Sequence, residues 1–384
     1  MVDLAEPGTV ALWGAMAGSK ANRDAGAPRT RFAILDLLRG LAALVVLEHH
    51  YPRPGGEPLF GVGYIAVDLF FVLSGYVLAH AYFDWLRRGA HPARFFRARL
   101  IRLYPLYLLA TLLQASFWLL WSVGIDPGAA LPKWSGTVAT ALVMLPTPPT
   151  WSLQPGVLFP FLVQAWSLFW ELVVNLIYAA WAKVTKSRVP VLLILAGAGG
   201  LIFGALTHGG MNLGWGWDGA VFGGARALYG LFVGIALWLV RERWRAPSIP
   251  AWLVALVMLL ALMPHRLGAG YELAVTLVVV PMIVWFGASA TSGRAVDRVG
   301  RELGLASYAI YVLQDPLRLV YVVVMNHVPR LRPALPLDLD WALSLVFIMA
   351  ASWLLTRWID QPVREALTKR LTPDRPPVPA QAAP

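Results

Sequence analysis

The sequence contains no cysteine and few charged residues. Without cysteine the protein has no disulfide, no thiolate metal site and no cysteine nucleophile. Only 14% of its 384 residues are charged, whereas 58% are hydrophobic and 18 are tryptophan. Soluble domains are only about half apolar and about a quarter charged, so most of this chain must lie in lipid.

The apolar residues form long runs separated by charged or Gly/Pro-rich breaks. A bilayer core about 30 Å thick needs about 20 apolar residues per helix, and barrel strands would instead alternate in polarity. We therefore predict an all-α, polytopic integral membrane protein of about ten spans. Their expected ranges are 32–50, 60–84, 102–124, 158–182, 190–206, 222–240, 250–263, 271–288, 305–326 and 340–358. A shorter apolar piece, 137–145, is expected to be re-entrant or interfacial.

The basic residues indicate the orientation. With the N-terminus inside, 21 Lys and Arg residues fall in segments facing the cytoplasm and 5 in segments facing outside. The positive-inside rule then places both termini in the cytoplasm. A basic cytoplasmic face also explains the net charge of +11, so we predict no nucleic-acid partner.

The two ends of the chain differ from the middle in composition. Residues 1–30 lack the basic start of a signal peptide, and the end of the chain is rich in proline. We predict disordered cytoplasmic tails over 1–30 and 367–384, flanking one transmembrane domain over 31–366.

The first span carries Asp36, Arg39, Glu48, His49 and His50. Charged groups at depth each cost roughly a few kcal/mol, so they are functional candidates. Arg39 and His50 are eleven residues apart, which is about three turns plus 20° and about 16 Å of rise. They therefore share a helix face, whereas His49 points about 80° away from it.

His50 can be interpreted in two ways. It is either an interfacial histidine that ends the span or a general base, the role that histidine most often takes at neutral pH. We expect that the carboxylates of Glu48 and Asp68 could orient the His50 ring. Asp68 lies in the otherwise apolar second span, whereas Ser74 in that span is interpreted as a packing residue rather than a nucleophile.

Two further segments carry charge next to or inside the membrane. The stretch 94–107 contains Arg97, Arg99, Arg102 and Tyr104, and it could anchor in lipid headgroups or bind phosphates. Glu171 lies near the middle of the fourth span and needs a cationic partner, for which Arg39, Arg102 and Arg226 are candidates.

Together these segments resemble the membrane-bound acyltransferase family 3, over residues 31–366. The family motifs fall on Arg39 and His50 with ten residues between them, Ala66 to Gly75, Arg99 and Arg102 with Tyr104, Pro105 and Tyr107, and Trp166 to Glu171. In the second motif Ala66 replaces the first glycine. Two departures stand out: Gln314 replaces the histidine of the late Ser-Tyr-x-Ile-Tyr-Leu-x-His-x-Pro motif, and the closing Glu-x-Pro is Asp360-Gln361-Pro362.

The resemblance implies an O-acyltransferase of the bacterial inner membrane. It would take acyl groups, usually acetyl, from cytoplasmic acyl-CoA and pass them to a hydroxyl of a carbohydrate or glycolipid-type acceptor outside. His50 would be the base or a transient acyl carrier. The predicted catalytic residues are His50, Arg39, Glu171 and Asp68, and those predicted to contact acyl-CoA are Arg97, Arg99, Arg102 and Tyr104.

We expect no metal site and no tightly bound cofactor, because acyl-CoA is a donor substrate. Two other classes remain open from the residues alone. The same intramembrane charges could line a proton or substrate path in a transporter or flippase, and the chain could also be a non-catalytic subunit for surface polysaccharide assembly.

Overall fold

A computed structural model describes residues 32–123, 127–184, 188–265, 267–327 and 335–371. The predicted N-terminal tail and most of the predicted C-terminal tail lie outside these residues. Within them every regular element is helical and no β-strand is present. The predicted all-α membrane fold is therefore confirmed.

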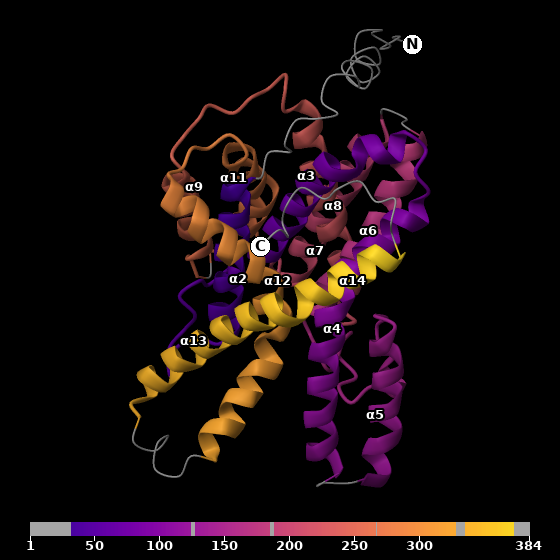
Figure 1. Ribbon diagram of the computed structural model, residues 1–384, viewed down its shortest axis with the longest axis vertical. Helices are drawn as coiled ribbons and strands as arrows, with labels where there is room; N and C mark the ends of the chain where they lie inside the picture. Colours follow the sequence, from indigo (N-terminus) through magenta and orange to yellow (C-terminus); the bar gives the residue numbers. More distant parts are fainter. Residues whose placement is uncertain (1–31, 124–126, 185–187, 266, 328–334, 372–384) are drawn as a thin grey trace.

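The helices follow one another with short connections (Figure 1). In chain order they are α2 (Ala33–His50), η1 (Gly63–Ile65), α3 (Ala66–Arg87), α4 (Pro92–Val123), α5 (Pro127–Leu142), η2 (Pro149–Trp151), α6 (Ala165–Val184), α7 (Val189–His208), α8 (Ala220–Val240), α9 (Ala251–Leu262), α10 (Ala269–Ala274), η3 (Val275–Val279), α11 (Val280–Gly287), α12 (Arg294–Asn326), α13 (Leu337–Leu355), η5 (Thr356–Asp360) and α14 (Gln361–Leu371). The elements η3 and η5 are π-helical turns that continue their neighbouring helices.

Eight helical stretches of the described chain are long and apolar enough to cross a membrane. They are α3, α4, α6, α7, α8, α10 with α11, α12, and α13 with α14. The helix α9 has only 12 residues, and α2 carries Asp36, Arg39 and Glu48 within its 18. These ten helices fall on the ten predicted spans, although the number of crossings stays a prediction.

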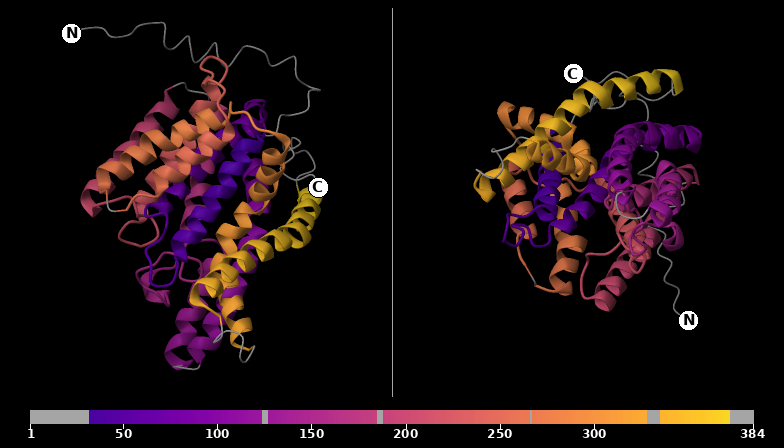
Figure 2. Two further views of the ribbon diagram at one scale, coloured as in Figure 1. Left: turned by 90° about the vertical axis from the view of Figure 1, so that its left-hand side faces the viewer. Right: turned by 90° about the horizontal axis from the view of Figure 1, so that it is seen from below.

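The helix α2 forms the centre of the bundle. Its residues from Ile34 to Leu38 and from Val45 to Leu47 are buried. It contacts α3, α9, α11 and α12, whereas the yellow α13 and α14 lie along the outside of the bundle (Figure 2). Burial of most of its residues explains why its few polar groups need partners inside the protein.

Glycines allow two helix pairs to pack closely. A Cβ at Gly304 would lie 2.6 Å from the Cβ of Asp36, and one at Gly75 would lie 2.0 Å from the Leu231 carbonyl oxygen. Such contacts require small residues on one helix. They bring the backbone of α12 against α2 and that of α8 against α3.

The directions of these pairs bear on topology. Gly300 lies against Ala33 and Gly304 against Asp36, so α2 and α12 run parallel. The helices α3 and α8 are parallel as well, because Asp68 pairs with Arg226 and Gly75 meets Leu231. Each parallel pair requires an odd number of membrane crossings between its two members. The ten-span prediction, with α9 crossing and α5 not crossing, satisfies both requirements.

The helix α5 contains most of the apolar piece that we predicted over 137–145. It is longer than that prediction, with 16 residues, and it runs antiparallel to α4 (Figure 1). Three bonds fix this direction: Tyr104 to the Leu142 carbonyl, Tyr107 to the Ala141 carbonyl and Trp134 to the Ala115 carbonyl. Hydrogen bonding to α4 therefore makes this segment half of a helical hairpin.

The predicted end of the domain at residue 366 falls inside α14. This helix continues to Leu371, whose carbonyl oxygen accepts a bond of 3.0 Å from Arg97. An ion pair of 3.0 Å between Arg364 and Asp360 ties its first turn to the preceding π-helix. Residues 367–371 thus belong to the folded domain, because tertiary contacts hold them.

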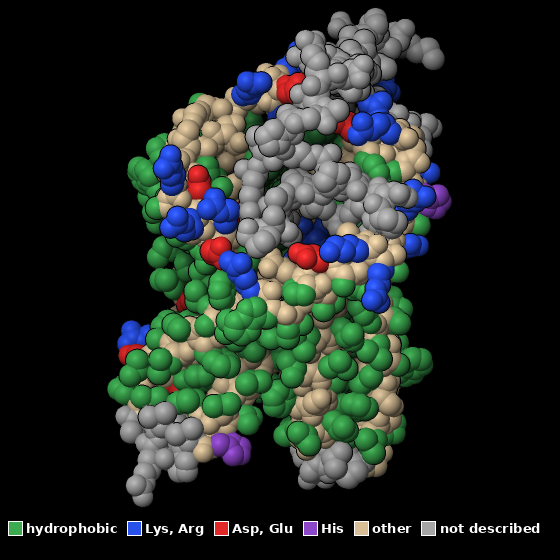
Figure 3. Space-filling view, in the orientation of Figure 1, with side chains coloured by type: hydrophobic (Ala, Val, Ile, Leu, Met, Phe, Trp, Pro, Cys, Tyr) green, Lys and Arg blue, Asp and Glu red, His purple; other side chains and the backbone are tan. Residues whose placement is uncertain are grey.

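Charged and apolar side chains occupy different halves of one face. In the space-filling view, Lys and Arg gather over the upper half and hydrophobic side chains cover the lower half (Figure 3). A notch divides the lower half between the α12–α13 pair and the α4–α5 pair. Such a division is typical of a membrane protein with one basic face.

Reporter fusions test the predicted topology. Reporters placed after Lys183 and after Arg245 should read cytoplasmic, because both residues end segments that carry basic residues. A reporter placed next to His208, at the end of α7, should read external. The opposite pattern would contradict the ten-span topology.

Candidate functional site

Arg39 joins α2 to α12. Its Nε donates to the Ser307 hydroxyl at 3.0 Å, and its Nη2 donates to the Asp36 carboxylate at 2.9 Å and to the Gly304 carbonyl at 2.7 Å. Asp36 lies on the same face of α2 because the two residues are three apart. The close approach of α12 at Gly304 brings the other two acceptors within reach.

Glu171 joins three further helices. Its Oε1 accepts from Arg99 of α4 at 2.5 Å and from Ser74 of α3 at 3.0 Å. The sequence had indicated Arg39, Arg102 and Arg226 as candidate partners, but the ion pair forms with Arg99. Arg99 reaches Glu171 because its place on α4 turns it inward, where its side chain is 5% exposed. Arg102 also interacts with Glu171 electrostatically.

Arg102 lies close to this pair. It interacts electrostatically with Arg99, Arg39, Arg364 and Glu171. We call Arg39, Arg99, Arg102 and Arg364 the arginine cluster. Three carboxylates accompany these four guanidinium groups, namely those of Asp36, Glu171 and Asp360. The cluster is therefore a region of positive charge at the meeting point of α2, α4, α6, α12 and α14.

The four predicted acyl-CoA contacts separate into two groups. Arg99 and Arg102 belong to the arginine cluster. Arg97 is exposed and bonds to the end of α14, whereas Tyr104 donates to the Leu142 carbonyl of α5 at 2.7 Å. Arg99 and Arg102 are three residues apart and share one face of α4, whereas Arg97 and Tyr104 are seven apart and share another.

A polar stripe follows α12 away from the cluster. Gly304, Ser307, Tyr311, Gln314 and Arg318 are spaced by three or four residues, so they share one helix face. We call this set the α12 stripe. The hydroxyl groups of Tyr311 and Ser167 of α6 lie 2.8 Å apart. Gln314 is 0% exposed, and both polar atoms of its side chain are buried without a hydrogen-bond partner in the described chain.

His50 ends α2 in an exposed position. Its Nδ1 lies 2.8 Å from the Val46 carbonyl oxygen. A carbonyl can only accept, so the neutral ring carries its proton on Nδ1 and leaves the Nε2 lone pair available. This is the tautomer that a general base needs.

His49 has different surroundings. Its Nδ1 donates to the Phe60 carbonyl at 2.9 Å, and its ring packs against that of Tyr64 with the centroids 5.5 Å apart. The rings of His49 and His50 are nearly perpendicular, at 89°. The two histidines thus face different parts of the protein.

Asp68 forms a buried ion pair. Arg226 of α8 donates to both of its oxygens, at 3.1 and 2.7 Å, and stacks on Trp166 at 5.0 Å. Glu48 accepts from the backbone N–H of Leu59 at 2.7 Å. The expectation that Glu48 or Asp68 orients His50 was therefore wrong, because both carboxylates bind elsewhere. A catalytic role for Asp68 stays a prediction.

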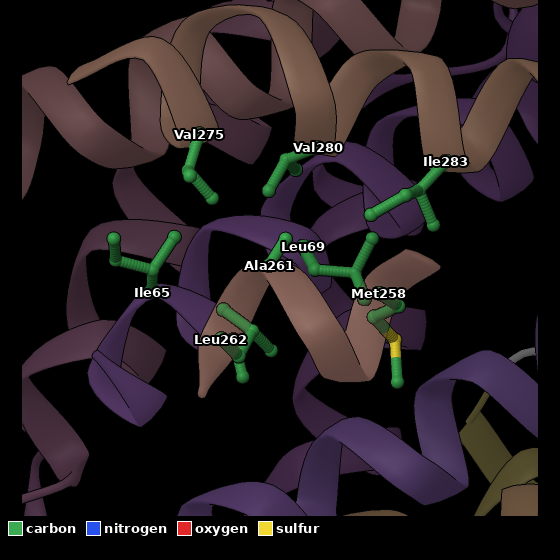
Figure 4. Close-up of a pocket in the computed structure, with 9 residues that line it drawn as sticks. Ile65, Leu69, Met258, Ala261, Leu262, Val275, Val280 and Ile283 are labelled. Carbon is green, nitrogen blue, oxygen red and sulfur yellow. The ribbon is translucent and has the colours of Figure 1, made fainter. Parts of the chain in front are cut away.

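An apolar pocket lies apart from these charges. Its walls come from η1, α3, α9, η3 and α11, and Ile65, Leu69, Met258 and Val280 are among its lining residues (Figure 4). The space cannot hold even a water molecule. We interpret it as a packing defect rather than a binding site. Among the described residues, no group of three His, Asp or Glu side chains could hold a metal ion.

Comparison with known proteins identifies the family. The model of the acyltransferase 3 family, described as an acyltransferase domain, matches residues 32–357. The chain belongs to this family. The family and the enzyme class predicted from the sequence, a membrane acyltransferase, are thereby confirmed.

Three curated relatives of this acyltransferase show significant similarity. Protein 2 in the picA locus of Rhizobium radiobacter is 42% identical over 188 residues, which is 44% of this chain and 93% of that protein. Acyltransferase MdmB of Streptomyces mycarofaciens is 29% identical, over 42% of this chain and 41% of its own. Exopolysaccharide production protein ExoZ of Rhizobium meliloti is 31% identical, over 34% and 38%. The chain thus matches less than half the length of the last two. No solved structure matches significantly.

The structure of this acyltransferase adds residues that the sequence reasoning missed. Tyr51 donates to Asp315 at 2.5 Å and lies under the Arg318 guanidinium. Burial and the Asp315 carboxylate raise the pKa of Tyr51 above its usual range, so the phenol stays protonated. The sequence did contain a signal for Arg318, because it is a charged residue inside the predicted span 305–326, one turn after Gln314.

Proposed function

We propose that this protein transfers an acyl group from acyl-CoA, held at the arginine cluster, to a hydroxyl of a carbohydrate-type acceptor near His50. The donor would be cytoplasmic, usually acetyl-CoA, and the acceptor would lie on the opposite side of the inner membrane. The names of two relatives, an acyltransferase and an exopolysaccharide production protein, support an acceptor of this class.

The observation that carries this proposal is the α12 stripe. It starts beside Arg39 with Ser307 and continues past Gln314 toward the level at which α2 ends with His50. A buried polar line between a cationic cluster and an imidazole suits a donor that has an anionic head and a long reactive arm. Arg99 and Arg102 are the proposed contacts of the phosphates.

His50 would act as the base. Its Nε2 would take the proton of the acceptor hydroxyl while the hydroxyl oxygen attacks the thioester carbonyl carbon. The carbon–sulfur bond would then break, and the coenzyme A thiolate would leave and take up a proton. Arg39 lies about 16 Å along α2 from His50, so we assign it to the donor end rather than to the oxyanion. Glu171 would position Arg99 and Ser74.

Acyl transfer by the purified protein tests this function. Incubation of the full chain in lipid nanodiscs with acetyl-CoA should release coenzyme A in a His50-dependent manner. A transporter, a flippase or an assembly subunit would release none. Absence of release, with or without added sugar acceptors, would contradict the proposal.

Incubation with the acyl donor alone, without an acceptor, distinguishes the two proposed roles of His50, transient acyl carrier and general base. If the histidine carries the acyl group, mass spectrometry after incubation with acetyl-CoA should find an acetyl group on the His50 ring. If His50 is only the base, that peptide should stay unmodified while acyl transfer proceeds. A His50→Ala control identifies any background acetylation.

Replacement of Arg102 tests the donor site. Arg102→Gln should raise the KM for acetyl-CoA about 10- to 100-fold, because a charge-assisted bond to phosphate is lost. The control is Arg88→Gln, which changes an exposed arginine at the end of α3. Unchanged KM for the Arg102 variant with poor membrane insertion would instead favour the lipid-anchor interpretation.

A further inference from the structure

Arg318 is a cation at the outer end of the α12 stripe with an unused donor. Its Nη1 is buried and makes no hydrogen bond with any described residue. Its guanidinium lies 5.9 Å from the centroid of the Tyr51 ring and 5.7 Å from that of Tyr321. Aromatic rings stabilise the charge, but they do not satisfy a buried N–H donor.

The carboxylates near Arg318 are bound to tyrosines. Asp315 accepts from the Tyr51 hydroxyl at 2.5 Å, and Asp340 of α13 accepts from the Tyr321 hydroxyl at 2.8 Å. Neither of them forms an ion pair with Arg318 in the described part of the chain. The embedded arginines Arg39, Arg99 and Arg226, by contrast, each contact a carboxylate. Arg99 also leaves its Nε without a partner, but its charge is paired with Glu171. Arg318 therefore differs from the other three in combining an unused donor with a charge that no described carboxylate pairs.

Gln314 provides a second, independent observation. It precedes Arg318 by one turn on the same stripe, is 0% exposed and leaves both its amide nitrogen and its amide oxygen without a partner. A buried amide normally makes hydrogen bonds, so the unused pair indicates a ligand that can both accept and donate. A sugar hydroxyl has that capacity. Arg318 contacts the ring of Tyr51, and Tyr51 directly follows His50 in the chain. The proposed base therefore lies at the same end of α2 as Arg318 and Gln314.

We propose that Arg318 and Gln314 form the acceptor subsite, and that the acceptor carries an anionic oxygen group beside the hydroxyl that is acylated. The group is a carboxylate or phosphate, because a guanidinium fork matches such oxygens. This inference rests on the proposed function, since it identifies the acceptor class at the same site. In this subsite Gln314 hydrogen-bonds to the hydroxyl groups of the acceptor, and Arg318 binds its anionic group.

Binding of two matched sugars tests the subsite. Methyl β-D-glucuronoside and methyl β-D-glucoside differ only in a carboxylate, and they can be titrated into the purified full chain in phosphatidylcholine nanodiscs. The glucuronoside should bind at least about tenfold more tightly. Arg318→Met should remove this preference, Arg318→Lys should keep part of it, and Gln314→Leu should weaken both sugars alike.

The control is Arg298→Met, which removes an exposed arginine from the other end of α12 and should keep the preference. Equal binding of the two sugars, no binding of either, or a preference that survives Arg318→Met would overturn the inference. A thermal stabilisation by phosphatidylglycerol that depends on Arg318, without a sugar preference, would assign the cation to a lipid phosphate and also overturn it. Because no donor is present, these outcomes are separate from the transfer assay.

Discussion

Replacement of His50 by alanine is expected to lower acyl transfer by roughly 10²- to 10⁴-fold. The imidazole is exposed at the end of α2, and the Val46 carbonyl holds its proton on Nδ1, so the available Nε2 is the atom that would be lost. The variant should still reach the membrane in folded form, because within the described chain this ring hydrogen-bonds to its own helix. Transfer rates at matched membrane levels measure the effect.

His49→Ala is the matched control. This ring faces the Phe60 carbonyl and Tyr64, away from the α12 stripe, so its removal should reduce transfer far less. Full activity in the His50 variant would refute the assignment of the base. A deeper loss from His49 than from His50 would show that the polar path runs along the other face of α2.

Asp68→Ala should lower the free energy of unfolding by about 3 to 5 kcal/mol. The change leaves Arg226, with a side chain 1% exposed, without its carboxylate, and an uncompensated buried charge is strongly destabilising. Bonds from Arg226 to the Leu213 and Tyr64 carbonyls would compensate only in part. Denaturant unfolding of the purified protein measures the loss.

A double variant separates structure from chemistry at this pair. Asp68→Leu with Arg226→Met removes both charges and should recover much of the stability and, with it, much of the activity. Asp338→Asn, which alters the exposed pair with Arg53, should change little. If the double variant is stable but inactive, Asp68 has the catalytic role that the sequence analysis predicted.

Several features of the fold could be predicted because they depend on composition along the chain. The ten predicted spans all fall on helices, since the length of an apolar run and the charge of its ends are local properties. The length of α5 and the continuation of the domain through α14 could not be predicted. They depend on bonds to α4, which lies elsewhere in the sequence.

The candidate site likewise has features that the sequence could predict and features that it could not. Helical spacing predicted different directions for His49 and His50, because rotation per residue is fixed within a helix. In the structure their Nδ1 atoms lie against different carbonyls, those of Phe60 and Val46. The pairing of Glu171 with Arg99 and of Asp68 with Arg226 joins different helices. Several arginines were plausible partners for Glu171, and rotation about the helix axes determines which one faces it.

The sequence by itself determined that this protein is helical, lies in the membrane and belongs to an acyltransferase family. Each of these properties follows from apolar runs, basic flanks or short motifs that can be read locally. Only the tertiary structure decided which charges are paired and which donors are left unused. It showed Asp68 as a buried structural partner and Arg318 and Gln314 as unsatisfied groups, because satisfaction of a polar atom depends on neighbours from distant helices.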